Sequence, residues 1–92
     1  MLTKEQIREI EDRCNAATKG PWESFIEGRD HLGGDSMIRT GGMDSDSPDL
    51  YIYDGTDADQ DFIAHARQDI PLLIAEIRRL QTIIDNASQV RT

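Results

Sequence analysis

Near the start of the chain, apolar residues recur every three or four positions, which predicts a helix with one narrow apolar face. Thr3 followed by Gln6 is the pattern of a capping box at the start of such a helix. Lys19-Gly20-Pro21 is expected to end it, because glycine suits a left-handed C-terminal cap and proline cannot continue the turn. The pattern therefore predicts a helix over residues 3–18 whose apolar positions are Ile7, Ile10, Cys14 and Ala17.

The pattern changes over residues 22–54, where short apolar runs are separated by glycine pairs and aspartates. Such runs are typical of an antiparallel meander. We expect strands near residues 22–27, 36–40 and 49–53, with turns at Gly33-Gly34 and Gly41-Gly42. In the third strand Tyr51 and Tyr53 should share one face, because strand side chains alternate.

Helical spacing returns after Gly55 and predicts a second helix over residues 58–87, starting at Asp57–Asp59, whose carboxylates favour a helix N-terminus. Pro71 lies inside this segment and removes one helical hydrogen bond. We expect either a kink near Gln68–Pro71 or a fresh start capped by Asp69. Residues 88–92 are expected to form a frayed tail.

The most regular apolar pattern of the chain lies in the second helix, where isoleucine and leucine alternate as at positions a and d of a heptad. One interpretation packs this surface on the first helix and the sheet, and the other makes it a subunit interface. Ile74 and Ile83 lie outside the pattern and widen the apolar surface. We call the patterned residues the a/d stripe; they are Ile70, Leu73, Ile77, Leu80 and Ile84.

Together these elements predict a single α+β domain over residues 1–92, with an N-terminal helix, a three-stranded antiparallel sheet and a long kinked C-terminal helix. A chain of 92 residues with 37% hydrophobic content builds only a thin core. A homo-oligomer formed through the a/d stripe would bury more apolar surface, so we expect self-association.

Charge limits the classes of partner. Eighteen acidic against ten basic side chains give a net charge of −8, which disfavours general nucleic-acid binding and anionic membrane surfaces. The single cysteine, Cys14, has no internal disulfide partner, and the sequence shows no leader and no long apolar run. We expect a cytoplasmic protein without membrane association.

Catalytic and metal-binding motifs are not recognisable in the sequence. All nine acidic residues between Gly28 and Asp61 are aspartates, but a calcium loop counted from Asp57 places Phe62 and Gln68 where glycine and glutamate are required. His31 and His65 have no second ligand at metal-binding spacing. We therefore expect a protein that is not an enzyme and that carries no metal and no cofactor.

Two segments are more distinctive, namely Ala17-Thr18-Lys19-Gly20-Pro21-Trp22 and Asp61-Phe62-Ile63-Ala64-His65-Ala66-Arg67-Gln68-Asp69-Ile70-Pro71. Together they resemble the Ead-like accessory proteins of temperate phages, with Lys19 at a position where that family usually has proline. The resemblance implies a phage or prophage accessory protein and supplies no active site. Such phage regions often carry small counter-defence proteins, and from this we expect a homo-oligomer that sequesters a nucleotide signal of bacterial immunity.

Such a role requires aromatic side chains for a base and cations for phosphate. We place the cationic part of the site around His65 and Arg67, beside the expected kink. The competing interpretation makes Trp22 a core residue and Arg67 a solvated cation. The full set of candidate binding residues is Lys19, Trp22, Arg39, Tyr51, Tyr53, His65 and Arg67.

Two other functional classes remain open. One is an acidic protein–protein interaction module that inhibits a host factor or mimics DNA. The other is a metal-dependent hydrolase that uses the aspartates.

Overall fold

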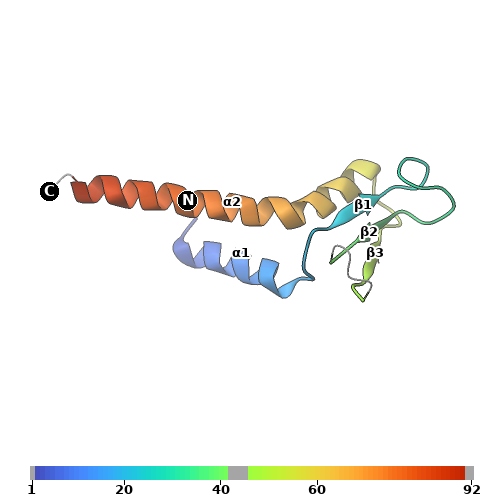
Figure 1. The fold of residues 1–92 in the computed structure, drawn as a ribbon, viewed down its shortest axis with the longest axis horizontal. Helices are drawn as coiled ribbons and strands as arrows, with labels where there is room; N and C mark the ends of the chain where they lie inside the picture. Colours follow the sequence, from blue (N-terminus) through green and yellow to red (C-terminus); the bar gives the residue numbers. More distant parts are fainter. Residues whose placement is uncertain (1, 42–45, 91–92) are drawn as a thin grey trace.

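The computed structural model describes residues 2–41 and 46–90. Its elements are α1 (Lys4–Ala16), β1 (Glu23–Phe25), β2 (Met37–Arg39), β3 (Asp49–Tyr51) and α2 (Asp57–Val90). The three strands are antiparallel in the order β1-β2-β3 and lie near the N-terminal end of α2 (Figure 1). The predicted α+β architecture is confirmed, with strands of three residues each that are shorter than expected.

A capping box starts each helix. At α1 the Thr3 hydroxyl accepts from the Gln6 N–H at 3.0 Å, and the Gln6 side chain accepts from the Thr3 N–H at 2.8 Å. Thr56 and Asp59 form the same pair of bonds at the start of α2, both at 3.0 Å. Each box satisfies N–H groups that lack a partner within the helix.

The end of α1 differs from the prediction. The helix ends at Ala16, and the cap residue Ala17 is extended and donates its N–H to the Arg13 carbonyl at 3.2 Å. Gly20 does not have a positive φ, so the expected left-handed cap is wrong: the chain has left the helix three residues earlier. Gly33 and Gly41 do have positive φ angles, of 80° and 72°, as suits the expected turns, whereas Gly42 lies outside the described residues.

One face of the sheet packs against α2. Ser24, Ile38 and Leu50 are cross-strand partners and so share this face, on which Ile38 is fully buried. The buried Gln60 of α2 donates to the Ser24 hydroxyl at 3.0 Å and to the carbonyls of Phe25 and Met37 at 3.2 and 3.0 Å. Alternation along each strand then places the neighbouring side chains on the opposite, open face.

α2 is one continuous helix of 34 residues that includes Pro71, so no fresh start occurs at Asp69. Figure 1 shows the helix changing direction in its N-terminal half, between its yellow and orange segments. The helix continues past the expected end at residue 87 to Val90, because no glycine or proline interrupts it. The molecule measures 65 × 26 × 19 Å, and its length follows from α2.

α1 packs on a side of α2 different from the one that the a/d stripe predicted. Ile7 of α1 and Ile74 of α2 are both buried, and Arg78 of α2 forms a two-bond ion pair with Glu11 of α1. Ile74, which lies outside the stripe, is therefore a core residue. The stripe itself is mostly exposed, so the interpretation that it packs on the first helix and the sheet is wrong.

Candidate functional site

The only tryptophan is fixed at the junction between α1 and β1. Its backbone N–H donates to Gln68 Oε1 at 2.9 Å, and its carbonyl accepts from Gln68 Nε2 at 3.0 Å. The side-chain amide of Gln68 therefore pairs with Trp22 as a neighbouring strand would. The ring is half-buried, which agrees neither with a fully buried core residue nor with a free surface aromatic.

The carbonyl of Thr18 joins Trp22 to Arg67. It accepts from Trp22 Nε1 and from Arg67 Nε, each at 3.0 Å. A carbonyl oxygen has two lone pairs, so both bonds can form together. Thr18 thus fixes the indole ring and the guanidinium side by side, although it lies 49 residues before Arg67 in the sequence.

Trp22 and Arg67 border a shallow groove between α1 and α2, which we call the Trp22 groove. Its volume is about 250 Å³. α1 contributes Ile10, Arg13 and Cys14, and α2 contributes Ala66 and Ile70 along with Arg67. The groove therefore combines an apolar surface with one indole and two guanidinium groups.

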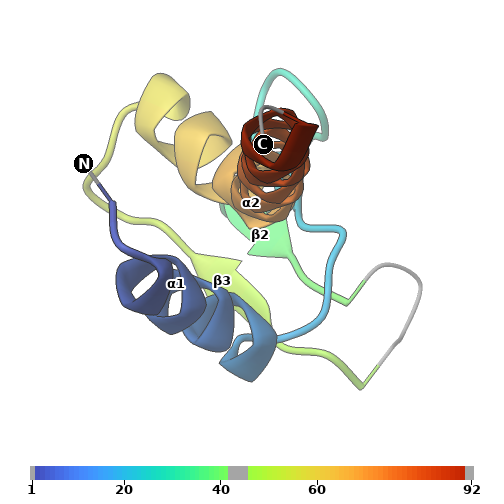
Figure 2. The ribbon, with the colours of Figure 1, turned by 90° about the vertical axis from the view of Figure 1, so that its left-hand side faces the viewer.

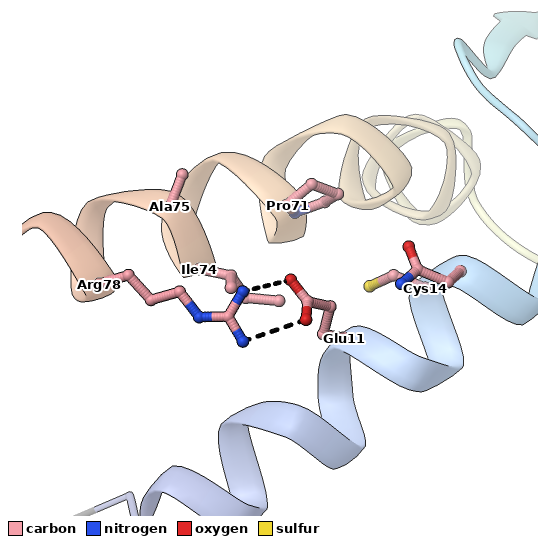
Figure 3. Close-up of a pocket in the computed structure, with 7 residues that line it drawn as sticks. Glu11, Cys14, Pro71, Ile74, Ala75 and Arg78 are labelled. Atoms are coloured by element: carbon pink, nitrogen blue, oxygen red, sulfur yellow. Dashed lines mark hydrogen bonds and ion pairs between the residues drawn. The ribbon is translucent and has the colours of Figure 1, made fainter.

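No acidic residue lines the Trp22 groove, and within residues 2–41 and 46–90 neither Arg13 nor Arg67 forms an ion pair. A second recess between the same helices, of about 230 Å³, gives the contrast (Figure 3). There the guanidinium of Arg78 faces the carboxylate of Glu11, and the two charges cancel locally. The Trp22 groove is therefore locally positive in a chain with a net charge of −8.

His65 does not join this groove. It lies two residues before Arg67 on a continuous helix, and a two-residue step turns by about 200°, so the two side chains point to different sides. His65 is exposed and lies near the Asp61 carboxylate. The prediction that His65 and Arg67 form one site is therefore wrong, because their closeness in sequence does not place them on one helix face.

Arg39, Tyr51 and Tyr53 form a separate surface. Arg39 and Tyr51 alternate with the buried Ile38 and half-buried Leu50, so they lie on the open face of the sheet. The Arg39 guanidinium lies 5.2 Å from the centre of the Phe25 ring, and the rings of Tyr51 and Tyr53 stack at 6.3 Å. The tyrosines share a face as predicted, but neither of them lines the Trp22 groove, so one site with all the expected aromatic residues is not formed.

Lys19 is exposed in the connection between α1 and β1. Its carbonyl accepts from the Gly41 N–H at 2.8 Å, which holds this connection against the end of β2. Its ammonium group forms no hydrogen bond and no ion pair with the described part of the chain. Lys19 is therefore next in sequence to the Trp22 groove without lining it.

A bidentate ion pair fixes the start of α2. Arg29 donates to both carboxylate oxygens of Asp61, at 2.8 and 3.0 Å, and also binds Asp30. Hydrogen bonding from Arg29, with a further bond from Ser24, lowers the pKa of Asp61 to about 2. Arg29, in the β1–β2 connection, thus binds two carboxylates, and the three side chains together keep one uncompensated negative charge.

Sequence reasoning missed several residues that shape the groove. Arg13 and Ile10 belong to α1. The only sequence signal for either residue was the place of Ile10 in the apolar pattern of that helix. Gln68 lay within the recognised second segment but was not assigned a role. Its bond to the Trp22 backbone depends on a contact across 46 residues, which no local pattern encodes.

In the described residues, no group of three or more His, Cys, Asp and Glu side chains is placed to hold a metal ion. Neither α1 nor α2, over the same residues, combines the length and the apolar content that a bilayer span requires. Comparisons of the chain with models of known protein families, with curated proteins and with solved structures give no match. The resemblance to the Ead-like proteins therefore stays a prediction.

Proposed function

We propose that this protein is a non-enzymatic binding protein that holds a nucleotide-derived anion in the Trp22 groove and acts as a homo-oligomer. The observation that carries the proposal is an apolar groove bordered by an indole ring and by two arginines without ion-pair partners in the described chain. A nucleotide offers the complementary parts, since a base has an apolar face and a phosphate accepts bidentate hydrogen bonds from a guanidinium.

The size of the groove limits what it holds. Ligand pockets usually measure about 300–1,000 Å³, and the Trp22 groove measures about 250 Å³. It suits one base or one ribose-phosphate unit, with the rest of the ligand outside. Arg67 is already oriented by its bond to Thr18, so its terminal nitrogens are left to meet an anion at little further entropic cost.

The Ead-like resemblance supports a biological role for such binding. We propose that the ligand is a nucleotide signal of bacterial immunity and that the protein lowers its free concentration by stoichiometric binding. This role requires affinity and no catalytic group.

Calorimetry with cyclic mono-, di- and trinucleotides and with ADP-ribose derivatives tests the proposal. We expect one class to bind, and Arg13→Ala to weaken its affinity about tenfold or more, because a hydrogen bond to a charged group contributes about 1.5–3 kcal/mol. Arg8→Ala is the matched control, because Arg8 lies on the same helix but does not line the groove. Equal losses in both variants would contradict a site in the groove, and no binding by the wild type would remove the nucleotide proposal.

If the wild type binds no nucleotide, the acidic interaction module is the alternative. Its carboxylate surface is interrupted, because Arg29 binds both Asp30 and Asp61. Binding to a basic host factor would weaken steeply with ionic strength, whereas a ligand stacked in the groove would weaken less. A salt titration therefore separates the two functions.

A further inference from the structure

We propose that a second copy of the chain packs on the a/d stripe and that the two α2 helices run antiparallel. The inference rests on the homo-oligomeric part of the proposed function and not on the ligand. Dimerisation and nucleotide binding can therefore fail separately in experiments.

The stripe is a continuous apolar surface that the described chain leaves largely uncovered, although Ile70 borders α1 across the Trp22 groove. Of its five residues only Ile77 is half-buried, and Leu73 and Ile84 are 62% and 63% exposed. α1 covers another side of α2, the one that carries Ile74 and Arg78. Figure 1 shows that α2 also extends well past α1, away from the sheet, and Figure 2, which looks along α2, shows α1 on one side of it. An apolar stripe of this length in water favours a protein partner.

A second copy fits the stripe because its heptad pattern is self-complementary. Isoleucine at position a and leucine at position d provide alternating knobs and holes on both chains. Standard interfaces bury about 800 Å² on each partner, and two helices that meet over about four turns bury less. We therefore expect a dissociation constant in the micromolar range.

The distribution of charge sets the direction. Residues 57–69 carry four aspartates against one arginine, whereas residues 70–87 carry two acidic and two basic side chains. The heptad frame extended backwards places Asp59 at position d, so parallel helices would bring two copies of Asp59 together. Isoleucine at a with leucine at d also suits parallel pairs, but antiparallel pairing separates the acidic halves of two chains that each carry −8.

Antiparallel pairing restricts the register. Positions a and d of one helix then face d and a of the other. Leu73 packs against Ile84 of the partner subunit, and Ile77 packs against Leu80 of the partner subunit. Ile70, which also lines the Trp22 groove, comes to lie beside the end of the partner's stripe. The partner helix would therefore add a wall to the shallow groove.

Light scattering after size exclusion, at protein concentrations from about 10 to 500 μM, tests the dimer. We expect a mass that rises to twice the chain mass. Leu73→Glu with Ile84→Glu should leave a monomer at all these concentrations, with unchanged helical circular dichroism because both residues are exposed within one chain. Leu72→Glu with Ile83→Glu is the matched control, since these residues are also exposed but lie outside the stripe. A wild-type monomer throughout, or loss of the dimer in the control pair as well, would overturn the proposal.

Disulfide cross-linking tests the direction, in a Cys14→Ser background that removes the only native thiol. Leu73→Cys with Ile84→Cys should give covalent dimers under mild oxidation, whereas Leu73→Cys alone should not. In antiparallel helices the two copies of residue 73 are about 16 Å apart along the axis, far beyond disulfide reach. Efficient cross-linking of Leu73→Cys alone would show parallel pairing and overturn the antiparallel arrangement.

Discussion

The side chain of Gln68 satisfies both backbone hydrogen-bonding groups of Trp22, with bonds of 2.9 and 3.0 Å. This pair joins the chain entering the sheet to the middle of the long helix. It also fixes the position of the indole ring, because the backbone that carries the ring has two directional bonds.

Gln68→Ala should lower the free energy of unfolding by about 1–3 kcal/mol, because it leaves two part-buried backbone groups of Trp22 without partners. Urea unfolding followed by tryptophan fluorescence measures this change. Gln81→Ala serves as the control, since Gln81 is half-buried on the same helix and its side chain forms no hydrogen bond within the described residues. Equal effects would mean that the Trp22 pairing contributes nothing specific.

Gln60→Leu should also destabilise the protein by about 1–3 kcal/mol. The amide of Gln60 is 2% exposed and contacts three acceptors in β1 and β2, which leucine would leave buried without a donor. Thermal unfolding by circular dichroism is the measurement. A melting temperature equal to that of the wild type would show that apolar packing alone can hold α2 on the sheet.

The two donors at the Thr18 carbonyl predict non-additive effects. Trp22→Phe and Arg67→Met each remove one donor, and each should cost about 0.5–1.5 kcal/mol, because the carbonyl keeps its other bond. The double variant should cost more than the sum, since Thr18 then has neither. A double-mutant cycle in urea provides the coupling energy, and strict additivity would argue against a shared acceptor.

Stability should fall in acid through Asp61. Its folded pKa of about 2 lies below the ordinary value of 3.8, so the carboxylate stabilises the fold above about pH 4 and loses this effect as the pH falls towards 2. Asp61→Asn should therefore make the melting temperature depend less on pH over this interval. Parallel curves for Asp61→Asn and the wild type would contradict the role of the Arg29 ion pair.

The α+β architecture followed from the sequence because its signals are local. Thr3 and Gln6 form the predicted capping box, and the short apolar runs between glycines form the predicted meander. The spacing of Thr56 and Asp59, with two residues between them, also indicates the second capping box from the sequence. This box locates the start of α2 more closely than the aspartates alone do. Hydrogen bonds across three residues depend only on neighbouring sequence.

Only the tertiary structure decided which apolar face of α2 is covered and which side chains meet. Periodicity identified the a/d stripe but could not reveal that α1 packs beside it on Ile74, because that choice depends on how the Trp22 junction orients α1. The same limit explains why Arg67 joins Trp22 whereas His65 and Arg39 do not. Helix rotation and strand alternation set the direction of each side chain, but the contact between Thr18 and Arg67 forms across 49 residues, and only the folded chain brings them together.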